Sequence, residues 1–349
     1  AEVLRQKNED LKSGVEATIK RDARAAMQSI ERSGKITEYD KATERRDAIA
    51  QKYAEMKPEQ RARTIVIDPS RAGRTELNEK IRAELKNRGA LGKDHATTMR
   101  DQKDLTNTEK KSARSYEVGD KVEFKRDYKQ DGLQKGREYT VTGKNEQKNT
   151  VQVKDSQGNA REFRASRPAA ANVNVYRHKE TALAKGDKIT FTAKDKSQGI
   201  ENGTRGEVKE IEGRQATIQT DKGKQVQVDL TKAQDMRHNY AVTTNAAQGK
   251  TADHVMVNAE SYRENLVNDK NFYVTVSRAR ESVDVYTDNK EKLTDAIQER
   301  AGGKSAALDQ HSSFAIVDKE LDAIVEQARE SGLTSDLSEY QADHQADHQ

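Results

Sequence analysis

An internal repeat constrains the fold of this chain more than any other feature. The segment GDKVEFKRDYKQDGLQKGREYTV, which begins at Gly119, matches GDKITFTAKDKSQGIENGTRGEV, which begins at Gly186, without a gap. Each copy then runs into a second hairpin pattern, NTVQVKDSQGNAREF or QATIQTDKGKQVQVDL, after a small shift in register. Short alternating apolar segments broken by Gly, Asp and Asn are typical of small antiparallel β units. The repeat therefore predicts two tandem barrels, over residues 116–182 and 183–232.

The patterns on both sides of the repeat predict an α/β sheet that the barrels interrupt. Upstream, RTIVIDPSRAGRTELNEKIR combines a short apolar run, a Pro-Ser turn and a helical pattern. Downstream, the apolar runs in HVMVNAE and VDVYTDN predict further strands, and a helix is expected at about 290–300. Strands that alternate with helices are typical of a parallel sheet. We predict one α/β domain from residues 1–115 and 233–304, followed by a C-terminal helix near 314–330 and a tail, within 305–349.

Local signals predict the boundaries of the N-terminal elements. Apolar residues at helical spacing predict one helix over residues 9–34, which ends at Gly34. A second helix is expected to be capped by Thr37 and to close before Pro58. Residues 93–115 are polar and weakly patterned, which indicates a linker.

Composition excludes several classes of protein. The chain has no cysteine, which removes disulfides and thiol chemistry, and this fits a reducing cytoplasm. No apolar run is long enough for a membrane span, so we expect a soluble protein without membrane insertion. Because 63 basic and 59 acidic residues nearly cancel, only local basic segments, at 60–82, 108–137 and 161–188, favour a polyanion partner. Solvated surface is the alternative interpretation of these segments.

The sequence Gln248-Gly249-Lys250-Thr251 resembles the end of a P-loop but fails the full motif. A P-loop has a second glycine five positions before the Gly-Lys pair, because successive backbone N–H groups must wrap the phosphates. Thr244 occupies that position, and Gln298 occupies it for the second candidate at Gly303. The histidines are scattered and predict no metal site. This chain is not expected to bind ATP by itself.

Several segments, taken together, resemble the motifs of superfamily 1 helicases. YAVTTNAAQGKT, NFYVTVSRAR and VDVYTDN resemble the last two signature motifs, and EVLRQKNEDLK is similar to the fourth. RTIVIDPSRAGRTELNEKIR is similar to the strand and DNA-facing turn of the second RecA-like domain. By this order, and by the insertion ahead of the fifth motif, residues 1–300 resemble the C-terminal helicase part of conjugative relaxases of the TraI/TrwC (MobF) type, which are RecD-like.

The resemblance implies a fold and a set of site residues. The fold is a RecA-like parallel-sheet domain with an inserted pair of small SH3-like barrels, 2B-like and 2B, and helical N- and C-terminal segments. Arginines that neutralise charge on the γ-phosphate correspond to Arg5 and Arg278, and Arg280 is assigned to the surface or an interface. Asn245 stands where many relatives carry His. The residues implied to bind DNA are Ser70, Arg71, Arg74, Thr243, Thr244, Asn245, Gln248 and Gly249.

The family also carries a secretion signal in its barrel region. GDKITFT is similar to that signal, which implies roles for Gly186, Asp187, Lys188 and Phe191 in recognition by the type IV coupling protein and secretion machinery. A Gly-Asp-Lys turn that enters a strand is also good hairpin chemistry, so a purely structural role is the alternative.

The resemblance implies part of an ATP-dependent 5′ to 3′ DNA helicase that acts in plasmid conjugation. Its implied cofactors are ATP and Mg²⁺, gripped mainly by residues outside this chain. Its implied partners are single-stranded DNA, an N-terminal relaxase and a first RecA-like domain of the same protein, in a cytoplasmic protein exported to the recipient cell. Walker A, Walker B and the nicking domain are missing from these residues, so no activity is expected from this chain alone. The alternatives are a non-enzymatic single-stranded-DNA-binding or secretion-adaptor module with a degenerate motor domain, and barrels that bind only protein.

Overall fold

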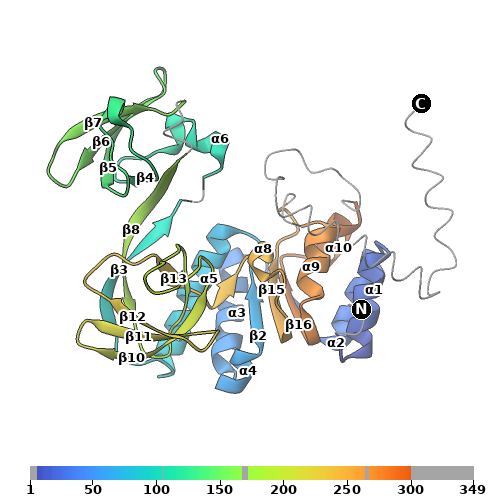
Figure 1. Ribbon diagram of the computed structural model, residues 1–349. Coiled ribbons are helices and arrows are strands. Elements are labelled where there is room, and N and C mark those ends of the chain that lie inside the picture. Colours follow the sequence, from blue (N-terminus) through green and yellow to red (C-terminus); the bar gives the residue numbers. More distant parts are fainter. Residues whose placement is uncertain (1–5, 104, 167–171, 264–266, 300–349) are drawn as a thin grey trace, which may run out of the picture. The chain divides into compact units, whose positions relative to one another are not determined.

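The computed structural model describes residues 6–103, 105–166, 172–263 and 267–299 (Figure 1). Its contacts define two compact units, one formed by the residues before 89 together with those from 240 onward, and one formed by residues 89–239. The second unit is thus an insertion into the first. Arg5 and the helix predicted near 314–330 lie outside the described residues.

The first unit is built on a parallel sheet, which confirms the predicted α/β class. Within the described residues the sheet has five strands in the order β1-β16-β15-β2-β14. These strands are β1 (Lys35–Glu38), β16 (Ala279–Thr287), β15 (Ala252–Ala259), β2 (Thr64–Ile67) and β14 (Ala241–Val242). Strand β14 follows the insertion and pairs with β2, which precedes it, through the register Ala241↔Val66. The chain segments before and after the insertion therefore form one continuous sheet.

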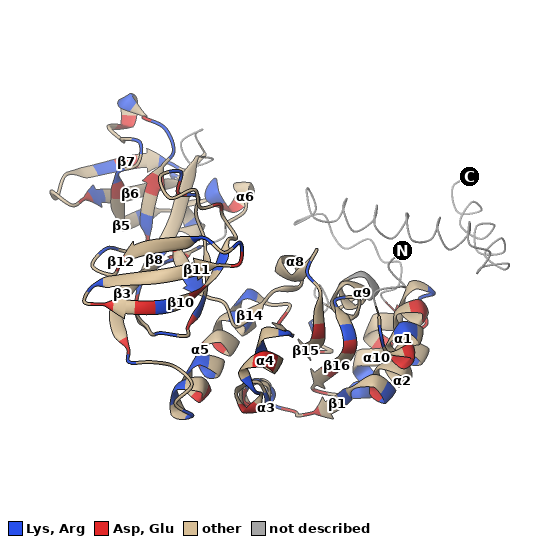
Figure 2. Ribbon diagram, turned by 60° about the horizontal axis from the view of Figure 1, so that its bottom comes forward, with Lys and Arg blue, Asp and Glu red and all other residues tan. Residues whose placement is uncertain are grey.

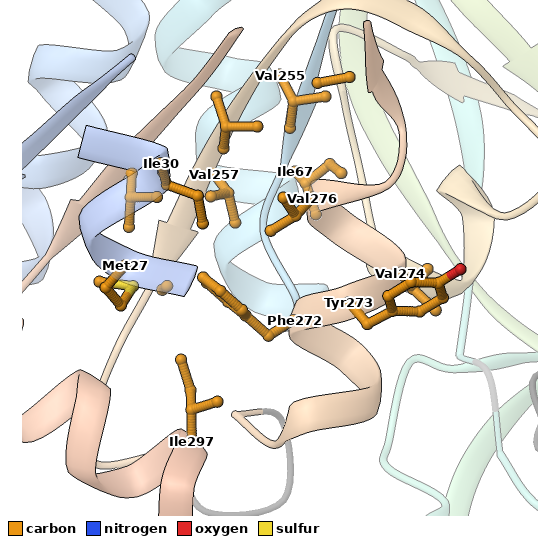
Figure 3. Close-up of a cluster of buried hydrophobic side chains, with 14 of the residues drawn as sticks. Met27, Ile30, Ile67, Val255, Val257, Phe272, Tyr273, Val274, Val276 and Ile297 are labelled. Atoms are coloured by element: carbon orange, nitrogen blue, oxygen red, sulfur yellow. The ribbon is translucent and has the colours of Figure 1, made fainter. Parts of the chain in front are cut away.

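Helices cover both faces of this sheet. The helices α1 (Glu9–Ile19), α2 (Ala23–Ser33), α9 (Asp269–Val276) and α10 (Lys290–Glu299) share one apolar core with the sheet (Figure 3). Val255 and Val257 of β15 point into this core. Because strand side chains alternate, Met256 and Asn258 point to the opposite face. There α3 (Ala42–Glu55) packs against α5 (Arg71–Asn87); two further short helices are α4 (Pro58–Ala62) and α8 (Thr244–Ala247).

Two of the predicted N-terminal boundaries are wrong. The helix expected over residues 9–34 is a pair, α1 and α2, because Arg21 adopts a φ of 60° and Asp22 accepts a hydrogen bond from Ala25 N at 2.9 Å to start a new helix. Thr37 caps no helix, because it lies in β1 and aligns with Tyr286 of β16. Pairing with a distant strand thus overrides the local helical signals. The predicted stop at Gly34 does hold, since Gly34 is the C-cap of α2.

The inserted unit is antiparallel. Within its described residues it has a six-stranded sheet in the order β3-β8-β4-β5-β6-β7 and a five-stranded sheet in the order β12-β11-β10-β9-β13. The strands are β3 (His95–Gln102), β4 (Lys121–Phe124), β5 (Glu138–Asn145), β6 (Thr150–Asp155), β7 (Ala160–Arg164), β8 (Val173–Leu183), β9 (Lys188–Phe191), β10 (Arg205–Glu212), β11 (Gln215–Thr220), β12 (Gln225–Asp229) and β13 (Met236–His238). Short helical turns are α6 (Asn107–Lys110), η1 (Ala113–Ser115) and η2 (Lys129–Asp131).

The sequence repeat corresponds to a structural repeat. Lys121 pairs with Thr140 between β4 and β5, and the equivalent Lys188 pairs with Glu207 between β9 and β10. The register shifts after Val141 in one copy and after the matching Val208 in the other. The two copies therefore fold alike down to the position of an irregularity in the ladder.

The linker predicted over residues 93–115 is wrong. This segment contains β3, α6 and η1, and it belongs to the inserted unit, which begins at Gly89. Strand β3 pairs antiparallel with β8, from His95↔Leu183 to Gln102↔Tyr176. A polar segment became a strand because β8, far away in the sequence, supplies its hydrogen-bond partners.

Candidate nucleic-acid interface

The structure brings together the two predicted DNA-contacting segments of the first unit. In a parallel sheet the strands end at a common carboxyl edge, and the neighbouring strands β2 and β14 lead there into Ser70 and Thr243. The Ser70 Oγ accepts a hydrogen bond from Gly73 N at 2.9 Å and begins α5, and Thr243 begins α8. Asp68 N donates to Val242 O at 3.0 Å, so the two turns are tied to each other.

The predicted residues at this edge differ in accessibility. Arg71 and Asn245 are exposed, whereas Arg74 and Thr244 are buried. The Arg74 Nη2 donates to Thr75 Oγ1 at 3.3 Å. The Thr244 Oγ1 is buried without a hydrogen-bond partner in the described part of the chain. Of these four residues, Arg71 and Asn245 are therefore the ones that reach solvent.

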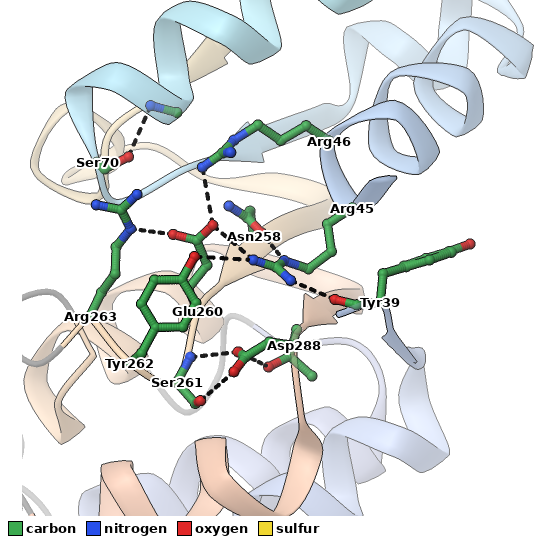
Figure 4. Close-up of polar contacts among 12 residues, drawn as sticks. Tyr39, Arg45, Arg46, Ser70, Asn258, Glu260, Ser261, Tyr262, Arg263 and Asp288 are labelled. Carbon is green, nitrogen blue, oxygen red and sulfur yellow. Dashed lines mark hydrogen bonds and ion pairs between the residues drawn. The ribbon is translucent and has the colours of Figure 1, made fainter. Parts of the chain in front are cut away.

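A buried ionic network underlies this edge, and the sequence did not predict it (Figure 4). The Arg45 Nη2 lies 2.9 Å from Glu260 Oε1, and its Nε donates to Asn258 Oδ1 at 3.2 Å. The Arg46 Nε and Nη2 lie 3.2 Å from Asp68 Oδ2 and Glu260 Oε1, respectively. Arg46 thus joins the ends of β2 and β15, and Arg45 holds the end of β15 beside it. Asp68 Oδ1 in turn accepts hydrogen bonds from Ser70 N and Oγ, each at 2.9 Å, which fixes the turn before α5.

The network sets the ionisation of its central carboxylate. Burial acts to raise the pKa of Glu260, but hydrogen bonds from Arg263 and Arg45 and the charge of Arg46 outweigh burial and hold this pKa below the ordinary 4.5. The carboxylate is therefore charged at neutral pH although the residue is only 2% exposed. In the sequence, the segment TERRDA has the charge pattern of a solvated helix, so it contained no signal for this role.

The predicted catalytic arginine lies at the opposite edge of the sheet. Arg278 directly precedes β16 and is 1% exposed. Its Nε donates to Val274 O at 2.9 Å and its Nη2 donates to Ser277 Oγ at 3.2 Å, so the guanidinium is hydrogen-bonded to the C-terminal end of α9, the helix that precedes it. The segment predicted as the fourth motif lies beside it, because Gln6 Nε2 donates to Ala279 O at 3.1 Å and Lys7 N donates to Arg280 O at 2.7 Å.

One segment connects the two edges. Residues 243–252 begin with Thr243 at the carboxyl edge, pass through α8, and reach Ala252, whose N donates to Arg278 O at 2.9 Å. Gln248 is half-buried along this path, and Gly249 is exposed with a φ of 70°. The segment that contains the Gly-Lys-Thr thus runs from the carboxyl edge to the amino edge, where its last residue is hydrogen-bonded to Arg278.

The residues predicted as a secretion signal mostly shape the fold. Gly186 has a φ of 90° and its counterpart Gly119 a φ of 93°, a region that favours glycine. Asp187 is 0% exposed, and its Oδ2 accepts a hydrogen bond from Ala184 N at 2.7 Å. Phe191 packs in the core of the five-stranded sheet. Lys188 is half-buried. The turn therefore needs Gly and Asp for its own geometry in both copies.

Charges are mixed across the described residues (Figure 2). Lysines and arginines are interspersed with aspartates and glutamates in both units, so a nucleic-acid interface here depends on a few placed side chains more than on a broad field. The described residues contain no group of His, Asp or Glu that could hold a metal ion. Among the same residues, no helix is long and apolar enough to cross a membrane.

Comparisons with known proteins agree with the resemblance to relaxase-helicases of the TraI type. A model of the DNA relaxase TraI 2B/2B-like domain matches residues 100–183, and a model of the viral superfamily 1 RNA helicase core domain matches residues 150–287. The multifunctional conjugation protein TraI of Escherichia coli is 25% identical over 258 residues, which is 72% of this chain. The chain is related to the helicase region of TraI-type relaxase-helicases. It spans 14% of the length of that TraI protein.

Other similar proteins match a shorter stretch of the chain or match it at lower identity. The probable conjugal transfer protein TraA of Sinorhizobium fredii is 35% identical over 109 residues, which is 30% of this chain and 9% of TraA. Among solved structures, a Pif1 helicase studied at forked dsDNA aligns over 92% of this chain and 53% of its own, at 13% identity and a TM-score of 0.41. The Pif1 helicase of Candida albicans aligns over 92% and 59%, at 11% identity and a TM-score of 0.40.

Proposed function

We propose that this chain supplies the second RecA-like domain, with two inserted SH3-like barrels, of the ATP-dependent DNA helicase of a conjugative relaxase that moves 5′ to 3′. One observation carries the proposal. Three segments that resemble separate helicase motifs meet at Arg278, through Gln6 Nε2 to Ala279 O and through Ala252 N to Arg278 O. A motor domain requires this convergence, because nucleotide and DNA must act on one another through it.

In this proposal the carboxyl edge binds single-stranded DNA. The first turn of the 17-residue helix α5 offers backbone N–H groups and the exposed Arg71 to a phosphate. Thr243, Thr244 and Asn245 line the adjacent turn, and Gln248 and Gly249 extend from it toward Arg278. Ser70 and Arg74 hold the turn and the helix in position.

The amino edge faces nucleotide. Arg278 and Arg5 neutralise charge that develops on the γ-phosphate of ATP, while Mg²⁺ and the main phosphate grip come from residues outside this chain. Because the Arg278 guanidinium rests on Val274 O, it must leave this hydrogen bond to reach a phosphate. Nucleotide binding is thereby connected to the helix α9 and to the segment 243–252.

The remaining partners follow from the same proposal. The chain works beside a relaxase and a first RecA-like domain of its protein, in the cytoplasm, and the protein reaches the recipient cell through a type IV coupling protein. Since Gly186, Asp187 and Phe191 serve the fold, Lys188 is the residue of this group best suited to contact the secretion machinery.

Arg278→Ala in the intact protein is the test. We expect ATP turnover to fall by about 10³- to 10⁵-fold, as for loss of an arginine finger, while affinity for single-stranded DNA stays within twofold. Arg280→Ala is the matched control, because Arg280 is 47% exposed and lies two positions away. Preserved turnover in Arg278→Ala would remove Arg278 from the catalytic set.

A non-enzymatic adaptor is the second candidate, favoured by the burial of Arg278. It predicts single-stranded-DNA binding by the intact protein that does not respond to ATP. The motor predicts an ATP-dependent change in that affinity.

A further inference from the structure

One exposed aromatic side chain stands out at the carboxyl edge. Tyr262 is 55% exposed, and among the described residues only Val118, in the other unit, is a large hydrophobic side chain of comparable exposure. Aromatic rings are usually buried because they remove a large apolar area from water. An exposed tyrosine ring is available to stack on a ligand, and tyrosine is common at binding surfaces because it has an apolar face and a polar end.

The ring lies on the same edge as the turns assigned to DNA. Tyr262 follows β15, which pairs with β2, and β2 leads to Ser70. Arg46 connects the two strand ends, because it contacts both Asp68 after β2 and Glu260 after β15. A strand of nucleic acid that follows the Ser70 and Thr243 turns can continue onto the turn of Tyr262.

This turn is held rigidly by buried groups. Ser261 N and Oγ donate to the Asp288 carboxylate at 2.7 and 2.5 Å. The buried Arg45 donates to the Tyr262 hydroxyl at 3.4 Å. Arg263 forms an ion pair with Glu260, and its guanidinium carbon lies 5.8 Å from the centre of the Tyr262 ring (Figure 4). A preorganised side chain loses less conformational entropy when it binds.

We propose that Tyr262 and Arg263 form a stacking platform for an unpaired base of single-stranded DNA, with Arg263 also contacting the adjacent phosphate. This inference rests on the proposed function and adds a DNA contact that the sequence did not reveal. An exposed tyrosine ring stacks on any base face, so the contact is tolerant of sequence. A duplex cannot use it, because its bases are already stacked on one another.

The proposed platform also explains why the arginines of the ionic network are buried. Arg45 and Arg46 are buried at a desolvation cost that a surface helix would not carry. Through Glu260 and the Tyr262 hydroxyl they fix the two residues that face the base. Arg263 keeps 37% of its side chain exposed, so it remains accessible while paired.

A single-tryptophan reporter tests the platform directly. The chain contains no tryptophan, so Tyr262→Trp places the only one at the proposed site. We expect saturable quenching of its fluorescence by oligothymidylate as the base stacks, and no quenching by a blunt duplex of equal length. If the variant binds oligothymidylate to saturation in a separate binding assay and its tryptophan fluorescence is not quenched, the proposal is overturned.

Binding measurements on the full chain provide the second test. We expect Tyr262→Ala to weaken oligothymidylate binding by about 5- to 100-fold with an unchanged salt slope. Tyr262→Phe should weaken it less, because it keeps the ring and loses only the contact of the hydroxyl with Arg45. Arg263→Gln should reduce the slope of log K against log salt by about 0.7, the value for one phosphate on a single strand. Arg63→Gln is the matched control, since Arg63 is 70% exposed and precedes β2 at the opposite edge of the sheet. The slope of log K against log salt should be the same for Arg63→Gln as for the unmodified chain.

The outcomes separate this inference from the proposed function. If the unmodified chain binds oligothymidylate and Tyr262→Ala binds it equally well, the platform is overturned and Tyr262 is assigned to a protein contact. If the unmodified chain binds no single-stranded DNA at any salt concentration, the proposed function fails and the platform fails with it. Circular dichroism of each variant checks that the fold is kept.

Discussion

At the scale of single residues, the buried carboxylate of Glu260 is the point on which the carboxyl edge depends. It is paired with Arg45, Arg46 and Arg263, two of which are themselves buried. Removing one partner of a buried ion pair leaves an uncompensated charge, which is far more costly than losing a pair in water. The network is therefore a site where one substitution has a large effect.

We predict that Glu260→Gln lowers the free energy of unfolding of the first unit by about 3–5 kcal/mol at neutral pH. Glu76→Gln is the matched control, because Glu76 also contacts Arg46, at 3.2 Å, but is 35% exposed. Its expected cost is at most about 1 kcal/mol. Urea denaturation of the three proteins gives both values, and equal losses would contradict the assignment.

The pH dependence checks the same carboxylate. Because the pKa of Glu260 is lowered from 4.5 on folding, its contribution to stability is present above pH 4.5 and is lost as pH falls through the lower folded value. We expect the unmodified chain to lose stability below pH 4.5 more steeply than Glu260→Gln does. Parallel curves for the two proteins would show that the carboxylate gains nothing from its arginines.

At the scale of elements, the short strand β14 depends on a helix for part of its hydrogen bonding. The buried Asn78 of α5 accepts from Tyr240 N at 2.6 Å and Ala241 N at 3.1 Å, and donates to Ala241 O at 3.0 Å. β14 lies at one end of the strand order, so the amide serves its outer side in place of another strand. The chain therefore re-enters the sheet at a defined position after the insertion, directly ahead of Thr243.

We predict that Asn78→Ala destabilises the first unit by at least about 2 kcal/mol, because each buried group left unpaired costs about 1–3 kcal/mol. Asn87→Ala, at the exposed end of the same helix, should cost less than about 0.5 kcal/mol. Thermal or urea unfolding measures both. Hydrogen exchange at Ala241 should also accelerate in Asn78→Ala, and unchanged protection there would refute this role of Asn78.

At the scale of the whole molecule, each of three apolar clusters among the described residues lies within one of the two units. The core shown in Figure 3 draws only on residues before 89 and after 240. Two separate clusters, one around Phe124 and Phe163 and one around Ile189 and Ile218, lie entirely within residues 89–239. Units with separate cores are expected to fold separately.

We predict that a fragment of residues 89–239 folds by itself and unfolds cooperatively on heating. Phe163→Ala should lower its stability by about 3–5 kcal/mol, because Phe163 is buried among other rings. Val118→Ala, at a residue 69% exposed, should change stability by less than about 0.5 kcal/mol. Circular dichroism on heating tests all three, and a fragment without a transition would show that the insertion needs its host.

The sequence by itself determined the features that depend only on residues a few positions apart. Gly119 and Gly186 with their following aspartates marked the repeat, because a left-handed turn and its buried aspartate need those residue types in any context. The strand and helix around Ser70, and the motifs near Arg278, were likewise visible, because period and turn chemistry extend over only a few residues.

The tertiary structure alone decided the features that need a distant partner. Strand β1 forms on β16, strand β3 forms on β8, and the charges of Arg45 and Arg46 are buried against Asp68 and Glu260. A polar strand or a buried arginine has the same local pattern as a solvated one, and what distinguishes them is a group supplied from elsewhere in the chain. The same holds for Tyr262, whose exposure and fixed position result from packing that no local pattern contains.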